Sequence, residues 1–151
     1  MLYHCRLDNF DEHLAEHRLV AADLDAGMRL LRTSVRKQDA QGAYEIAEAL
    51  LDIWTERELA HAQAEQLWLY ETIPMLKALQ RDHDLMLIWV NEARDLLDHE
   101  GRVTTSVLMR LEALMSLLHT HHDHEMQYLQ YYNPGPNLGG GLIVPEWDPS
   151  L

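Results

Sequence analysis

Chain breakers are almost absent from the first 132 residues of this 151-residue chain. Four of the seven glycines and four of the five prolines follow Tyr132. Stretches without proline or glycine can run as long helices, whereas a Gly/Pro-rich stretch cannot continue one. The sequence therefore predicts an all-α domain over residues 1–132 and a Gly/Pro-rich C-terminal tail over residues 133–151.

The few remaining breaks divide this domain into four segments. They are the polar stretch 37–42, the proline at position 74, the charged turn 100–102 and the Asn-Pro-Gly-Pro stretch 133–136. Within each segment, apolar residues recur at alternate spacings of three and four, which indicates a helix with one buried face. Four such helices with short connections predict an up-down-up-down antiparallel four-helix bundle.

Charge and composition exclude several classes of partner. The net charge of −13 argues against binding nucleic acid or an anionic membrane, because both need a basic face. No apolar run approaches the roughly 20 residues of a membrane span, and the N-terminus lacks the pattern of a signal peptide. The single cysteine, Cys5, rules out an internal disulfide framework. We expect a cytoplasmic protein.

The apolar stripes of the four helices are interrupted by polar residues near one end. Such groups cost on the order of several kcal/mol on a core-facing stripe unless they are paired or coordinate something. The second stripe also carries Trp54 and Trp68, which we expect to pack in the core near these polar groups. The interrupting residues are His17, Glu58, His61, Glu65, His83, His121 and Glu125.

Distances from the connections place these residues at one height in the bundle. Residues equally far from a short turn lie at about the same level of neighbouring helices. His17 and His61 are each 22 residues from Asp39, and Glu65 and His83 are each nine residues from the proline at position 74. The same count of residues from the turn at position 101 places His121 and Glu125 of the fourth helix at about this height as well.

The donors in this layer suit metal ions. Two pairs have the spacing His-x-x-x-Glu, which puts both side chains on one helix face, one turn apart. Four imidazoles and two carboxylates are too many for one tetrahedral zinc, but they suit two ions of higher coordination number with bridging carboxylates. Nitrogen and oxygen donors without thiolate favour iron or manganese. The predicted ligands are His17, His61, Glu65, His83, His121 and Glu125.

Other assignments are open for individual residues. A lone core histidine is more often satisfied by hydrogen bonds than by a metal, although four at one level with two glutamates favour a metal. Glu58 either hydrogen-bonds a ligand imidazole or replaces Glu65 as a ligand. His13, one turn before His17, is an alternative ligand at the depth of Glu65. His122 and His124 flank the apolar stripe of the fourth helix. We expect them at most to contact the ligand side chains, without binding the metal themselves.

The order of these elements resembles the hemerythrin-like family, also called the HHE cation-binding family. The resemblance covers about residues 8–132, with one element in each predicted helix. It rests on His17 within Glu16–Leu19, on His61–Glu65 followed by Leu67–Leu69 and Pro74, on Asp82–His83, and on His121–Glu125 with Leu129. It implies two non-haem iron ions, bridged by an oxo or hydroxo group and by the two glutamates.

The chain differs from the oxygen-carrying members of that family. Those have His-x-x-x-His on the third helix, but here Leu87 is four residues after His83. They also have a longer spacing on the fourth helix than the four residues from His121 to Glu125. The set of four histidines and two glutamates is more similar to di-iron proteins that repair iron centres, and to bacterial relatives of peroxide and nitric oxide responses.

This resemblance predicts a non-haem di-iron protein that binds or reacts with dioxygen, peroxide or nitric oxide. The expected role is oxidative or nitrosative stress response or iron-centre repair. An iron or oxygen sensor, or an iron-storage module without turnover, is the alternative, and a structural bundle with adventitious metal is a third. The expected ligand is a small diatomic or a peroxide. The candidate protein partners are an electron-donor protein and a second copy of the chain.

Overall fold

The computed structural model describes residues 7 and 9–132, and it contains helices but no strand in these residues. The prediction of an all-α domain is confirmed for them, whereas Cys5 and the predicted tail lie outside them. None of the described helices combines the length and apolar character needed to cross a membrane. The elements are α1 (Phe10–Arg36), α2 (Ala40–Ile53), η1 (Trp54–Glu58), α3 (Leu59–Ala64), η2 (Glu65–Leu69), η3 (Pro74–Leu79), α4 (Gln80–Glu100) and α5 (Thr105–Tyr132).

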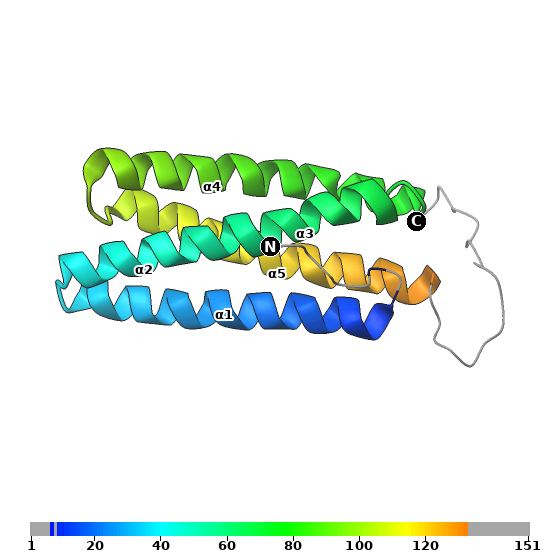
Figure 1. Ribbon diagram of the computed structural model, residues 1–151, viewed down its shortest axis with the longest axis horizontal. Coiled ribbons are helices and arrows are strands. Elements are labelled where there is room, and N and C mark those ends of the chain that lie inside the picture. Colours follow the sequence, from blue (N-terminus) through cyan, green and yellow to red (C-terminus); the bar gives the residue numbers. More distant parts are fainter. Residues whose placement is uncertain (1–6, 8, 133–151) are drawn as a thin grey trace, which may run out of the picture.

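These elements form four helical rods that pack together (Figure 1). The second rod is continuous from α2 through η1 and α3 to η2, and the third begins with η3 and continues as α4. α1 packs along α2 and α5, and α4 packs along α5. The α1–α2 and α4–α5 connections lie at one end of the bundle, and the connection from η2 to η3 lies at the other (Figure 1).

Local chemistry fixes where several helices begin and end. Asn9 Oδ1 accepts a hydrogen bond from the backbone N–H of Glu12 at 3.1 Å, and Asp39 Oδ1 accepts one from Gly42 at 2.9 Å. These caps satisfy backbone donors that the first helical turn leaves without a partner. Gly101 ends α4 in the left-handed conformation, with φ of 64°, which glycine adopts without steric penalty.

The apolar core consists of two clusters with the polar residues between them. On α1, for example, Leu14 packs with the smaller cluster and Val20 belongs to the larger one, and His17 lies between them. The larger cluster runs along the bundle toward the α1–α2 and α4–α5 connections. The smaller cluster, called the apolar cap below, contains Tyr70, Ile73, Leu76, Leu79, Met126 and Leu129. The polar layer therefore has apolar packing above and below it.

Two π-helical segments, η1 and η2, interrupt the second rod on either side of α3. In η2 the N–H of Tyr70 donates to the carbonyl of Glu65, five residues earlier, at 2.9 Å. The wider π turn changes which residues face inward after Glu65. Tyr70 is buried, whereas Trp68 is 74% exposed. The prediction that Trp68 packs in the core is therefore wrong, and that for the buried Trp54 is confirmed.

Candidate metal centre

All six predicted ligands are buried and lie together between the two apolar clusters. They form, with His13, two overlapping groups of donor atoms. In each group the atoms lie within 4.8 Å of one another. The larger group contains His13, His17, His61, Glu65 and Glu125, and the smaller contains Glu65, His83, His121 and Glu125. The structure thus brings the predicted residues together, and their binding of metal stays a prediction.

Three imidazoles of the larger group direct their Nε2 atoms at one another. His17 Nε2 lies 3.1 Å from His13 Nε2 and 2.9 Å from His61 Nε2. The third side of this triangle, from His61 to His13, is 3.1 Å. α1 supplies two of the rings, one turn apart, and α3 supplies the third.

These three nitrogens cannot all satisfy one another by hydrogen bonds. A ring nitrogen either carries a proton and donates, or lacks one and accepts. Among three nitrogens at least two are of the same kind, so at least one contact of the triangle joins two donors or two acceptors. A cation that takes all three lone pairs removes this conflict. The arrangement therefore fits a bound metal ion better than a hydrogen-bonded core.

The smaller group repeats the pattern with two imidazoles. His83 Nε2 on α4 lies 2.9 Å from His121 Nε2 on α5. The phenolic oxygen of Tyr70 is 3.3 Å from His83 Nε2. This group therefore has one imidazole fewer than the larger group.

Both glutamates reach from one group to the other. Glu125 Oε1 lies 3.1 Å from His13 Nε2, and its Oε2 lies 3.5 Å from His121 Nε2. Glu65 Oε2 lies 3.2 Å from His13 Nε2, and its Oε1 lies between the groups, 3.4 Å from His61 Nε2 and 3.7 Å from His83 Nε2. Glu125, with one oxygen toward each group, has the placement of a bridge between two metal ions, and Glu65 is within reach of both groups.

The nitrogen–nitrogen distances also bear on the coordination geometry. Two nitrogens about 2.1 Å from a metal are about 3.0 Å apart at a bond angle of 90°, and about 3.4 Å apart at the tetrahedral angle. The observed distances of 2.9, 3.1 and 3.1 Å in the larger group, and 2.9 Å in the smaller, match the right angle. Nitrogens at these distances can therefore share one ion, and the same distances also separate hydrogen-bonded atoms.

Two further side chains contact the ligands directly. Asp82 Oδ2 lies 3.1 Å from His121 Nδ1, the usual way in which a carboxylate fixes the orientation of a ligand imidazole. The hydroxyl of Tyr70 donates to Glu125 Oε2. Both contacts hold the ligands of the smaller group in their orientation.

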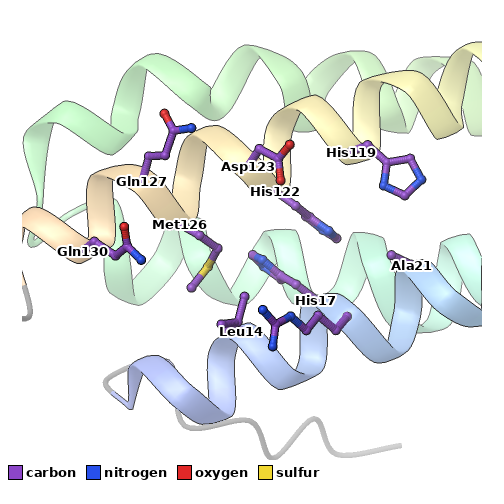
Figure 2. Close-up of a pocket in the computed structure, with 10 residues that line it drawn as sticks. Leu14, His17, Ala21, His119, His122, Asp123, Met126, Gln127 and Gln130 are labelled. Carbon is purple, nitrogen blue, oxygen red and sulfur yellow. The ribbon is translucent and has the colours of Figure 1, made fainter. Parts of the chain in front are cut away.

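Glu58 belongs to neither donor group, although its exposed fraction is only 1%. Its Oε1 accepts a hydrogen bond from His122 Nε2 at 2.8 Å. The ring of His122 in turn stacks on the ring of His17, with 3.9 Å between centroids and 4° between planes. Figure 2 shows these two rings face to face between α1 and α5. Glu58 thus supports a ring that stacks on a predicted ligand, and Glu65, unlike Glu58, belongs to both donor groups.

Burial sets the protonation state of most of these imidazoles. It lowers the pKa of His61 to about 3 and that of His83 to about 4, and it lowers the pKa of His17 well below its ordinary value. For His121 burial acts in the same direction, but hydrogen bonds with Glu125 and Asp82 outweigh it and raise its pKa. Three of the rings are therefore neutral at neutral pH, the form in which imidazole binds a metal.

Little or nothing in the sequence pointed to two residues of this centre, His13 and Tyr70. His13 was only an alternative ligand, yet it is fully buried and touches both glutamates. Its signal was the spacing of four to His17, which puts both rings on one face of α1. Tyr70 had no signal, because a regular α-helix after Glu65 would not turn it inward.

Comparisons of the chain with protein-family models, with curated proteins and with solved structures gave no match. The assignment of the centre therefore depends on its own geometry.

We expect the metal-free protein to lose stability as the pH falls from about 6.5 toward 4. Unfolded histidines take up protons near their ordinary pKa of 6.5, whereas His61 and His83 in the fold resist until about 3 and 4. Protons therefore favour the unfolded chain, by up to about 2 kcal/mol per ring at pH 5. The raised pKa of His121 opposes this trend, but only for one ring.

Urea denaturation of the metal-free protein between pH 7 and pH 5 measures this effect. The His83→Gln variant should show a shallower dependence, because it removes one of the resisting rings. A midpoint that stays constant or rises as the pH falls would contradict the assignment of neutral buried imidazoles.

Proposed function

We propose that this chain is a non-haem di-iron protein of the hemerythrin-like type, with the up-down-up-down bundle of that family. The single observation that carries the proposal is that two groups of donor atoms share both carboxylates, Glu65 and Glu125. Two ions with two common carboxylates account for this arrangement. One ion would leave several of the buried donors without a use.

Iron fits the donor set better than the other common metals. The nitrogen and oxygen donors include no thiolate, which disfavours copper(I), and the seven buried residues of the two groups exceed the four ligands of one tetrahedral zinc. The larger group offers five protein donors and the smaller group four. An octahedral ion has six positions, so each ion would keep room for a further ligand. Two such irons supply redox chemistry toward dioxygen, peroxide or nitric oxide.

The chain's own residues provide a dry and oriented setting for this chemistry. Met86 and Leu118 from the larger cluster, and Met126 and Leu129 from the apolar cap, limit water on either side of the polar layer. Burial and the neighbouring Glu125 raise the pKa of Tyr70, so its hydroxyl keeps its proton beside the smaller group. That proton is held at Glu125 Oε2.

We expect the protein to act on a small oxidant in the cytoplasm, in oxidative or nitrosative stress response or in iron-centre repair. Reduction of an oxidant needs electrons from outside the bundle, so an electron-donor protein is part of this proposal. The support for it is the donor set and the open positions that the donor set leaves.

Protein purified without a histidine tag should contain two irons per chain and absorb in the visible range. Replacing either bridging carboxylate removes a donor that both ions share, so Glu65→Ala and Glu125→Ala should each lose bound iron and change the spectrum. Metal analysis and absorption spectroscopy check this. The di-iron proposal would be wrong if both variants kept two irons and an unchanged spectrum, or if the protein held one zinc.

The two groups should respond differently when one imidazole is removed. His13 belongs to the larger group alone, so His13→Ala should lower the iron content from about two toward about one per chain. His124 is exposed and belongs to neither donor group, so His124→Ala is the matched control and should keep both irons. Equal losses in the two variants would contradict the assignment of His13.

An iron sensor or store without turnover is the second candidate. The observation that favours it is the conflict among the three Nε2 atoms, because metal binding relieves it and so couples occupancy to the stability of the bundle. Consumption of hydrogen peroxide or nitric oxide by the iron-loaded protein favours the oxidant-reactive function. A large rise in stability on iron loading without any turnover favours the sensor or store.

A further inference from the structure

Two surface pockets reach the candidate metal centre from different sides. The α1–α5 pocket has a volume of about 320 Å³ and is lined by His17 and His122, among others. The α3–α4 pocket has a volume of about 390 Å³ and is lined by His83. The first pocket therefore borders the larger donor group, and the second borders the smaller one.

The inner wall of the α1–α5 pocket is closed by stacked rings. In Figure 2 the rings of His17 and His122 lie against each other beside this pocket. Their planes are 4° apart and their centroids 3.9 Å apart, which leaves no space for a molecule between them. The hydrogen bond from His122 to Glu58 holds the outer ring in place. A small molecule in this pocket therefore meets two imidazoles that leave no gap between them.

The α3–α4 pocket has a different lining. Ala60 and Ala62 on α3 leave room between the helices, and Leu59 and Leu87 give part of the wall an apolar surface. Leu87 is 49% exposed, one turn after His83 on α4. A small molecule in this pocket therefore meets His83 beside a wall that is apolar at Leu87 and polar at Gln63.

The number of protein donors in each group also favours the side of the α3–α4 pocket. The larger group has five protein donors, so an octahedral ion there keeps one position. The smaller group has four, so its ion keeps two. The less crowded half of the centre is thus the half that the α3–α4 pocket borders.

We propose that the α3–α4 pocket is the entrance through which a small end-on ligand, such as dioxygen, nitric oxide or azide, reaches the half of the centre held by His83 and His121. This inference rests on the di-iron function proposed above. It adds the side of the bundle from which the ligand approaches. It also assigns Leu87 as a residue that controls access.

Azide binding to the iron-loaded protein tests the entrance. An obstacle in a route slows entry and exit alike, so Leu87→Trp should lower the association and dissociation rates of azide together by about tenfold, with Kd unchanged. Leu87→Ala should raise both rates. Leu87 is half-exposed, so both variants should fold. Stopped-flow absorption gives the rates, and an equilibrium titration gives Kd.

The α1–α5 pocket provides the matched control. Ala21 lines that pocket and is not a predicted ligand, so Ala21→Phe should leave both azide rates within about twofold of the wild type. The entrance is overturned if Ala21→Phe slows azide and Leu87→Trp does not. It is also overturned if neither variant slows azide, if Leu87→Trp changes Kd instead of the rates, or if the wild type with two irons binds no azide.

Iron content, measured first on each protein, separates the two proposals. A wild-type chain that cannot hold two irons overturns the di-iron function and the entrance with it. A chain that holds two irons but admits azide from elsewhere overturns the entrance alone.

Discussion

The structure depends on the burial of five imidazoles and two carboxylates that point at shared centres inside an apolar bundle. Such groups are expensive to bury unless each has a partner. The three Nε2 atoms of His13, His17 and His61 cannot all satisfy one another, because a triangle of donors and acceptors contains at least one unfavourable contact. A cation bound at this layer would remove the conflict, and it would then stabilise the fold as well as supply chemistry.

The same constraint explains the irregular second rod. Between Glu58 and Tyr70 it must present polar side chains inward on successive turns, and the two π-helical segments lie at the ends of this stretch. The wide turn after Glu65 places a hydroxyl beside the smaller donor group, where the larger group has a third imidazole. π turns of this kind occur often at functional sites. The two halves of the centre are consequently unequal in donors and surroundings.

Much of this could be predicted from residue types and spacing. The scarcity of glycine and proline predicted helices, and equal distances from the turns placed His17, His61 and His83 in one layer. Height along a helix does not determine which donors share a group across the bundle, so the assignment of His13 needed the structure. Trp68 lies on the surface and Tyr70 in the core because a π turn changes the phase of the helix, and no sequence period signals such a turn.

The division of the apolar core by the polar layer has a consequence for how the molecule opens. The apolar cap, which includes Leu76 and Leu129, has few residues compared with the larger cluster, and the donor layer separates the two. Regions with little buried apolar surface exchange their amide hydrogens by local opening, at a lower free energy than global unfolding. A metal bound by residues of all four rods would hold this end of the bundle together. Its entry and release would then need only the opening of this end, while the other end stays folded.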